Sequence, residues 1–301
     1  MITKNYLISI LILGFILGDA AGQKPLELSV TAKGAVLEKL SDGFSFTEGP
    51  TPDMDGNVYF TDQPNDRIME WSVDDNLTTF MQPCGRSNGM FTDNKGFIWD
   101  CADEKTELWK IGPDKKREIV VSGFNGKPFN GPNDVWVAPD GGAYITDPFY
   151  ARPWWNYSIK PQEKERVYYI APGTKSAVIV IDDLEQPNGI VGSPDGKTLY
   201  IADIQANKTW KYAIGPGGNL SGKTLFCEFG SDGMTMDEKG NVYITGTGVH
   251  IFDSSGKLIG NIPVPEKWTA NVCFGGKDHK SLFITASTGL YRVKMKVRGA
   301  F

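Results

Sequence analysis

The amino-acid sequence predicts an all-β fold, a six-bladed β-propeller built from four-stranded blades. Three observations predict it: a polar–glycine motif that recurs six times, short strand-like runs between frequent turns, and the absence of any long helical pattern. The chain has 301 residues with 35 glycines and 18 prolines, which punctuate many short elements. Hydrophobic residues at 40% and charged residues at 22% are typical of a soluble globular protein.

Each repeat opens on a polar residue, and in the first five repeats a glycine follows at a fixed distance, as from Glu48 to Gly56. A run rich in Val, Ile, Tyr and Phe comes next, such as 58–62, followed by two further strand-like runs. The repeat period is about 45 residues, which is the length of a propeller blade. The six leading residues are Glu48, Asn88, Asn133, Asn188, Asp232 and Asn271.

The sixth repeat runs out after its third strand, near 291–297. We expect residues 35–40, which precede the first repeat, to supply the missing fourth strand. This N-terminal strand would complete the last blade, close the ring through both termini and protect the sheet edges.

Residues 1–22 have the layout of a cleaved secretory signal, with Lys4, an apolar run over 6–17 and small residues before Gln23. The apolar run is shorter than the roughly 20 residues that a bilayer span needs. We therefore expect a signal peptide at 1–22, one propeller domain over 23–301, and a periplasmic or secreted protein without membrane association after cleavage.

Charge and composition restrict the partners and the chemistry. The net charge is −5 and no basic stripe is present, so no nucleic-acid partner is expected. Export permits a disulfide between Cys84 and Cys101, although two buried thiols are the equal alternative. The two histidines, His250 on an expected outer strand and His279 in a turn, make a Ser-His-Asp triad or a His-ligated zinc site improbable.

The inner strand of each blade lines the channel of a propeller, so we expect the six leading residues to form a ring near one mouth. Glu48 and Asp232 would then converge, and a cation between them would remove their repulsion. Carboxylate and amide oxygens suit calcium best, with zinc, manganese and magnesium as alternatives. A wet channel with polar side chains and no function is the competing interpretation.

One long aromatic insertion lies between the second and third strands of blade three, at 148–165. Long loops of this kind are often functional, so we interpret it as a lid over the site, against the alternative of a loop packed on the outer edge.

The segments at 60–68, 87–90, 131–135, 145–148, 187–190 and 232–234 resemble the gluconolactonase family, which includes senescence marker protein and luciferin-regenerating enzyme. The resemblance covers about 44–295. It implies a propeller with one divalent metal in the channel and hydrolysis of sugar lactones. Carried over by motif, it implies that Glu48, Asn188 and Asp232 are metal ligands, with Asn133 as a further ligand or a substrate contact.

In the mechanism that this resemblance implies, the cation polarises the lactone carbonyl and Asp232 activates the attacking water, with Glu48 as the alternative base. The expected substrate contacts are Asn133, Asn88, Asn130 and Arg152, and Asp147, Tyr150 and Trp154 are candidates for the rest of the pocket. Family members often place an arginine shortly before the Asn-Asp pair, where this chain has Phe-Asn-Gly-Pro at 129–132.

Two other functions remain open at this point. The same site could cleave phosphotriesters, or the propeller could bind sugars without catalysis. For either enzyme the expected partner is a small molecule, and a closed ring needs no second copy, so we expect a monomer.

Overall fold

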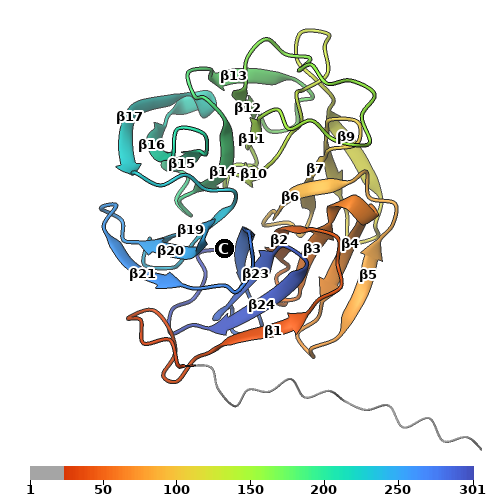
Figure 1. Ribbon diagram of the computed structural model, residues 1–301. Coiled ribbons are helices and arrows are strands. Elements are labelled where there is room, and N and C mark those ends of the chain that lie inside the picture. The colour runs from red at the N-terminus through yellow and green to blue at the C-terminus, as the bar shows by residue number, and fades with distance from the viewer. Residues whose placement is uncertain (1–23) are drawn as a thin grey trace, which may run out of the picture.

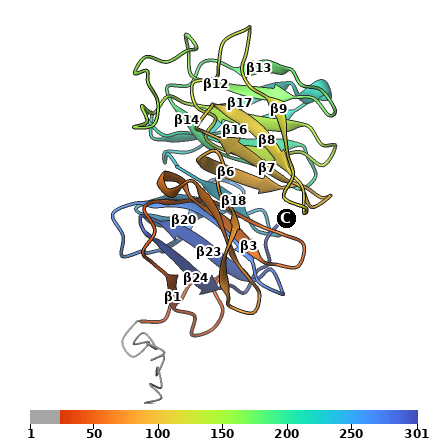
Figure 2. The same ribbon diagram turned by 90° about the vertical axis from the view of Figure 1, so that its right-hand side faces the viewer.

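The computed structural model describes residues 24–301 as six four-stranded antiparallel sheets around a central channel (Figure 1). The predicted all-β, six-bladed propeller is confirmed, and Figure 2 shows the same ring from its side. The predicted signal peptide at 1–22 lies outside the described residues.

Each blade is a meander in which the first strand lies at the channel and the last at the rim. Blades one to three contain β2 (Thr47–Pro52), β3 (Val58–Asp62), β4 (Arg67–Trp71), β5 (Leu77–Met81); β6 (Ser87–Thr92), β7 (Ile98–Ala102), β8 (Glu107–Ile111), β9 (Arg117–Val121); and β10 (Val135–Val137), β11 (Ala143–Asp147), β12 (Arg166–Ile170), β13 (Ala177–Ile181).

Blades four to six follow the same plan. They contain β14 (Pro187–Gly192), β15 (Thr198–Asp203), β16 (Lys208–Ile214), β17 (Leu220–Cys227); β18 (Met234–Met236), β19 (Val242–Gly246), β20 (Gly248–Phe252), β21 (Leu258–Ile262); and β22 (Thr269–Gly275), β23 (Ser281–Ala286), β24 (Gly289–Lys294), β1 (Leu37–Ser41). Two short 3₁₀ turns, η1 (Gln63–Asn65) and η2 (Pro216–Gly218), complete the described elements.

The ring closes through β1, which pairs antiparallel with β24 and becomes the outer strand of blade six (Figure 1). The expected closing strand is therefore present, with bounds of Leu37–Ser41 instead of 35–40. Arg292 of β24 reinforces the pairing by donating from Nε and Nη2 to Glu38 Oε2 at 3.0 and 2.9 Å.

Aspartates build the inner hairpin turns. Oδ1 of Asp53 accepts the backbone N–H groups of Asp55 and Asn57 at 3.0 and 2.9 Å. Asp93 and Asp237 repeat the arrangement in blades two and five. In these three blades the Asx turn connects the inner strand to the second strand and so helps to set the register between the two strands.

The hydrophobic core lies between the facing sides of adjacent blades. Trp136 of β10 is fully buried and lies flat against Gly192 of the next blade, where an added Cβ would come within 2.3 Å of the indole. Such close packing leaves no room for a larger residue at this point and holds the two blades in fixed relation.

The cysteines and the question of a membrane span are the two remaining points away from the channel. All four cysteines are buried, and none forms a disulfide within residues 24–301, so Cys84 and Cys101 are buried thiols. In the same range, no helix is long and apolar enough to cross a membrane.

Candidate functional site

A cavity of about 360 Å³ opens at the end of the channel where the inner strands begin; we call it the upper cavity. Of the ring residues, Glu48, Asn88, Asn133 and Asp232 line it, and Asn188 lies just behind, with Nδ2 donating to the Tyr150 hydroxyl at 2.9 Å. The structure therefore brings the four predicted metal ligands together. The lining residues are Phe46, Glu48, Gln63, Asn88, Asn133, Tyr150, Arg152, Gln186, Ile204, Gln205, Asp232 and Trp268.

Blade six does not contribute the residue that the repeat predicts. The backbone of Asn271 exchanges hydrogen bonds with the Thr285 hydroxyl, at 3.1 and 3.2 Å. In blade three the equivalent exchange with Thr146 is made by Asp134, one residue after the ring position. Asn271 therefore corresponds to Asp134 and lies one layer below the ring.

The ring position of blade six is consequently occupied by Ala270, which is buried and apolar. The expectation of six polar ring members is wrong for this blade. Strand β22 is one residue longer before its turn than the inner strands of the other blades. Applying the repeat spacing back from His279 therefore gives Asn271 instead of Ala270.

The layer below the ring holds one carboxyl and one carboxamide. Asp134 accepts the backbone N–H groups of Val135 and Ile190 at 3.0 and 3.3 Å, and burial raises its pKa to about 8. Asn271 hydrogen-bonds the Glu48 carboxyl. Asp134 is therefore mostly protonated at neutral pH and adds little charge beneath the ring.

Glu48 and Asp232 meet in this site. Burial raises the pKa of Glu48 well above its usual range and the charge of Asp232 raises it further, although the Gly49 N–H donates to Oε2 at 2.8 Å. Burial also raises the pKa of Asp232, against hydrogen bonds with Trp268, Asn188 and Glu48 and the charge of Arg152, all of which lower it. Two carboxyls that hydrogen-bond each other share a proton unless a cation replaces it.

The amide oxygens also fit a cation. Since Asn188 Nδ2 faces Tyr150, its Oδ1 is directed elsewhere, and this buried oxygen has no hydrogen-bond partner within residues 24–301. Asn88 Oδ1 is equally buried and unpartnered there. Buried carbonyl oxygens without partners are costly, and a hard cation beside two carboxyls would satisfy them. Within residues 24–301, no three His, Cys, Asp or Glu side chains lie close enough together to hold a metal ion. A cation in the upper cavity would therefore need amide oxygens beside the two carboxylates.

Trp268 orients Asp232 from above. It belongs to the segment between β21 and β22, and its indole Nε1 donates to Asp232 Oδ2 at 2.5 Å. The tryptophan is 38% exposed at the edge of the upper cavity, while the carboxyl is partly exposed inside it. The bond fixes one oxygen of Asp232 and leaves the other for a cation or a water.

Buried aspartates at the ends of second strands position the ring residues. Asp147 accepts the N–H groups of Asn130 and Gly131 at 3.0 and 2.8 Å, just before Asn133. Asp203 accepts those of Glu185 and Gln186, both at 2.9 Å, just before Asn188. These aspartates cap the loops that enter the inner strands, and Asp147, a candidate for the pocket, does not line the upper cavity.

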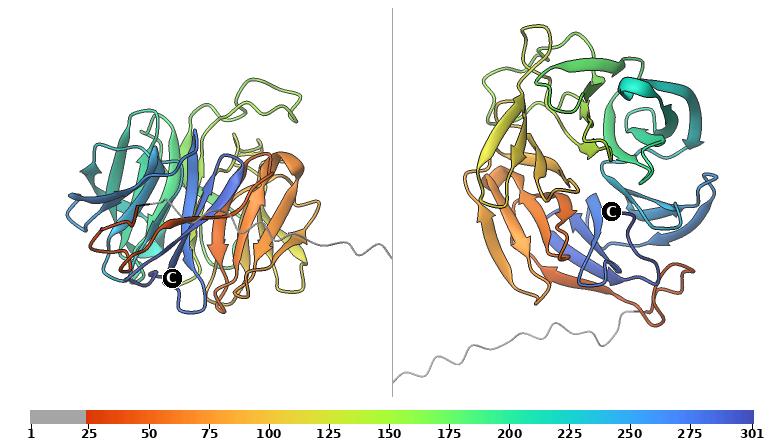
Figure 3. Two further views of the ribbon diagram at one scale, coloured as in Figure 1. Left: turned by 60° about the horizontal axis from the view of Figure 1, so that its bottom comes forward. Right: turned by 180° about the vertical axis from the view of Figure 1, so that it is seen from behind.

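The 148–165 loop supplies part of the cavity wall. Tyr150 and Arg152 line the upper cavity, and the loops of this region project from one face of the ring (Figure 3). Trp155 anchors the loop by donating from Nε1 to the Asp103 carbonyl at 3.0 Å and stacks on Tyr157. Tyr150 and Arg152 thus reach the mouth of the channel, while Trp155 and Tyr157 pack beside blade two.

Asn130 does not reach the substrate cavity. It is fully buried, its Nδ2 donates to the Lys164 carbonyl at 3.0 Å, and its Oδ1 accepts the Gln162 N–H at 2.9 Å. The side chain holds the end of the 148–165 loop, which argues against the expected substrate contact. Trp154 likewise lies outside the lining and packs against Arg86.

Several lining residues were not foreseen. Gln63, Gln186, Gln205 and Trp268 face the upper cavity. Gln63 directly follows a second strand, a position that the repeat could have indicated. Trp268 lies in an irregular connection, where no repeat signal exists.

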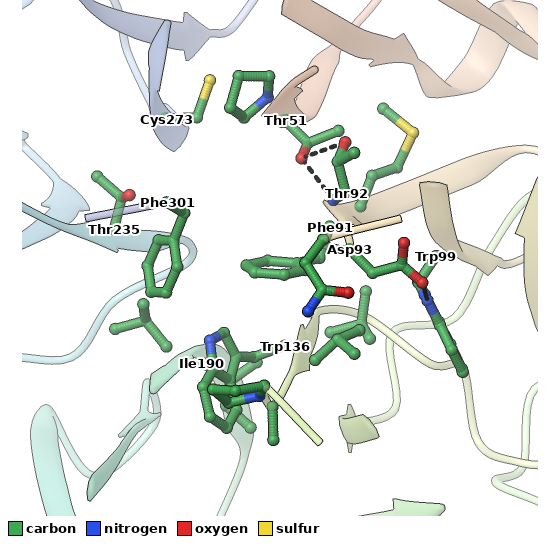
Figure 4. A pocket seen from close by; sticks show the side chains of 18 of the residues that line it. Thr51, Phe91, Thr92, Asp93, Trp99, Trp136, Ile190, Thr235, Cys273 and Phe301 are labelled. Atoms are coloured by element: carbon green, nitrogen blue, oxygen red, sulfur yellow. Dashed lines mark hydrogen bonds between the residues drawn. The ribbon is translucent and has the colours of Figure 1, made fainter. Parts of the chain in front are cut away.

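A second, larger cavity of about 740 Å³ occupies the other end of the channel; we call it the lower cavity (Figure 4). Its labelled walls include Phe91, Trp136, Ile190 and Phe301, and Phe91 meets Phe301 edge-to-face with ring centres 5.5 Å apart. The C-terminal residues enter here, as Ala300 N–H donates to the Met236 carbonyl at 3.0 Å.

Comparisons with known proteins agree with this architecture. The SMP-30/gluconolactonase/LRE-like region matches residues 46–288. A gluconolactonase of Zymomonas mobilis is 30% identical over 87% of this chain and 82% of its own. The solved structure of a Xanthomonas campestris gluconolactonase superposes with a TM-score of 0.81 at 25% identity, covering 93% and 99% of the two chains. That of a provisionally assigned gluconolactonase gives 0.83 at 30% identity, covering 90% and 95%.

Proposed function

The chain belongs to the SMP-30/gluconolactonase/LRE-like family, and on that premise we propose that it is a lactonase that opens sugar lactones with a divalent cation, calcium, in the upper cavity. One observation carries the proposal. Glu48 and Asp232 converge beside the unpartnered buried oxygen of Asn188, at the wall of a cavity large enough for a sugar. The gluconolactonases to which the chain is similar support the choice of reaction.

Glu48, Asn188 and Asp232 would hold the cation, with Asn133 as the fourth protein ligand. When bound, the cation supplies Lewis-acid polarisation of the lactone carbonyl and stabilises the negative charge that develops on its oxygen. An all-oxygen donor set of carboxylates and amides favours calcium over zinc, and magnesium and manganese are the other ions to compare.

Asp232 acts as the general base. It accepts a proton from the attacking water as the water oxygen bonds to the carbonyl carbon, and the proton then passes to the ring oxygen as the ester C–O bond breaks. Glu48 is less suited to this role because it is 4% exposed and bonded to Gly49 and Asn271. Asp232 faces the cavity, and Trp268 holds it in place.

Substrate hydroxyls would meet Asn88, Asn133 and Arg152, all on the wall of the upper cavity. The amide N–H₂ of Asn88 is available to donate to a sugar hydroxyl, whereas its Oδ1 is buried.

The test is metal removal followed by reloading. The chelated protein should lose turnover of glucono-1,5-lactone, and calcium should restore it better than zinc, manganese or magnesium. An aryl phosphotriester assayed in parallel separates the lactonase from a phosphotriesterase, and tight sugar binding without turnover would indicate a receptor. Full lactone hydrolysis by protein with no measurable metal would overturn the proposed mechanism.

We also propose that the protein is exported, loses residues 1–22 and acts as a monomer. The apolar run over 6–17 and the small residues that follow it support export. N-terminal sequencing of protein from the native host should begin at Gln23, and light scattering should give the mass of one chain. Retention of residues 1–22 in the cytoplasm would contradict export.

A further inference from the structure

Arg152 is the only cationic side chain that lines the upper cavity among the described residues. It comes from the 148–165 loop, and its charge is close enough to lower the pKa of Asp232. A cation so near the reacting groups must either be neutralised by the protein or be available to the substrate.

The guanidinium makes one ion pair and is not completely covered. Its Nε lies 3.1 Å from Asp103 Oδ2, and its Cζ lies 5.6 and 5.7 Å from the ring centres of Tyr150 and Trp154. Asp103 is 1% exposed, whereas the arginine side chain is 21% exposed where it borders the cavity. Because Asp103 meets the guanidinium at Nε, the terminal nitrogens are left for a ligand.

Asp103 cannot by itself neutralise the charge of Arg152, because the same carboxyl also lies near Arg86. Arg86 packs on Trp154 with Cζ 4.7 Å from the ring centre. Burial raises the pKa of Asp103 to about 6, and the charges of Arg152 and Arg86 both act against this rise. A divalent cation would neutralise the ionised pair Glu48 and Asp232. The loaded site therefore keeps one net positive charge, located at the loop side of the cavity.

The other acids near this loop are engaged elsewhere. Asp66 and Asp147 each accept two backbone N–H groups. Glu165, at the end of the same loop, is ion-paired with Lys160 at 3.5 Å. Asp134, beneath the ring, lines the lower cavity, which Arg152 does not reach, and its carboxyl accepts the backbone N–H groups of Val135 and Ile190.

We infer that Arg152 determines specificity, and that the preferred substrates are sugar lactones carrying an anionic group, a carboxylate, phosphate or sulfonate, on a carbon remote from the lactone carbonyl. This inference rests on the proposed lactonase function. A planar guanidinium binds two oxygens of such a group through parallel hydrogen bonds, which a hydroxyl cannot match. The cavity volume of about 360 Å³ is sufficient for a hexose lactone with one additional oxyanion.

The experiment compares kcat/KM for two matched pairs with the calcium-loaded protein. One pair is glucono-1,5-lactone and its 6-phosphate, and the other is glucono-1,4-lactone and glucaro-1,4-lactone. We expect the wild type to favour the anionic member by roughly 10- to 100-fold in at least one pair, the size of a charge-assisted contact. The two pairs distinguish phosphate from carboxylate recognition.

Variants then locate the cause. Arg152→Gln should bring the selectivity ratio close to one, mainly through a higher KM for the anionic substrate. Arg152→Lys keeps the charge but loses the planar fork, so its ratio should be intermediate. Lys164→Gln is the matched control, because it removes one positive charge from the same loop, where the side chain pairs with Asp182 outside the cavity, and it should keep the wild-type ratio.

Two results would overturn the inference: no preference for the anionic member in either pair, or an equal loss on both members in Arg152→Gln with no change in their ratio. These results differ from a failure of the proposed function, in which the loaded wild type would hydrolyse none of the four lactones.

Discussion

The two ends of the channel differ in chemistry more than in shape. The lower cavity has about twice the volume of the upper one, yet apolar side chains such as Phe91, Trp136 and Ile190 form much of its wall. The smaller upper cavity gathers the carboxyls of Glu48 and Asp232 with an unpartnered amide oxygen. The comparison teaches that convergent polar groups, and not cavity size, mark the candidate reaction site in this ring.

The most direct test that the reaction takes place in the upper cavity is to remove one of its carboxylates. Asp232→Asn and Glu48→Gln should each lose the cation and lower kcat by about 10²- to 10⁴-fold, because the ligand or base is lost. Elemental analysis and lactone turnover measure the two effects.

Thr235→Val is the matched control for these variants, since Thr235 lines the lower cavity and valine has nearly its shape. It should keep both the cation and the activity. An Asp232→Asn protein that retains one ion and near wild-type turnover would remove the basis for placing the reaction in the upper cavity.

The indole of Trp268 gives a subtler test. Trp268→Phe removes the hydrogen bond to Asp232, which lowers the pKa of that carboxyl, so the pKa should rise. A base that must be ionised then works only at higher pH. At pH values on the acidic side of the kcat profile, we expect kcat to fall about 10- to 100-fold. The pH at which kcat begins to rise should move upward. A uniform loss at every pH would instead indicate a structural role.

The shared proton between Glu48 and Asp232 predicts a pH-dependent affinity for the cation. Because both pKa values are raised, the metal-free site holds a proton that binding must release. Affinity should therefore increase with pH, by up to about tenfold per unit while the proton remains bound. Calorimetry in two buffers of different ionisation enthalpy should detect about one proton released per ion. Affinity that does not vary with pH would show that the pair is already ionised.

The smallest effect is expected at the lower cavity. Phe301→Ala removes the edge-to-face contact with Phe91 and should lower the free energy of unfolding by about 0.5–1.5 kcal/mol at most, since Phe301 is 37% exposed. Urea unfolding measures this change, and kcat/KM should not change. A tenfold loss of activity would mean that the lower cavity is linked to the reaction.

The repeat made the ring predictable from sequence. Equivalent positions such as Glu48 and Asn133 face the channel because each blade repeats the same strand and turn chemistry. The same reasoning misplaced Asn271, since one extra strand residue before a turn shifts the count without changing the motif. A local repeat reports spacing along the chain, whereas the ring depends on pairing between strands.

The rest of the site lies in irregular segments, where the sequence indicated Arg152 but not Trp268. Trp268 and Arg152 lie in connections that differ from blade to blade, so their positions follow from packing alone. Asn130 looked like a substrate contact because it lies close to Asn133 in sequence, yet it hydrogen-bonds to loop backbone. Proximity along the chain does not give the direction of a side chain at a loop entrance.

The pairing of β1 with β24 has a consequence for folding. Arg292 and Glu38, which bond across this pair, are 254 positions apart. Five blades can form from local hairpins as the chain is made, but the sixth must wait for the last strands to find the first. Closure of the ring should therefore be the slow, late step of folding, and truncation of either terminus should leave blade six with an open edge prone to association with other chains.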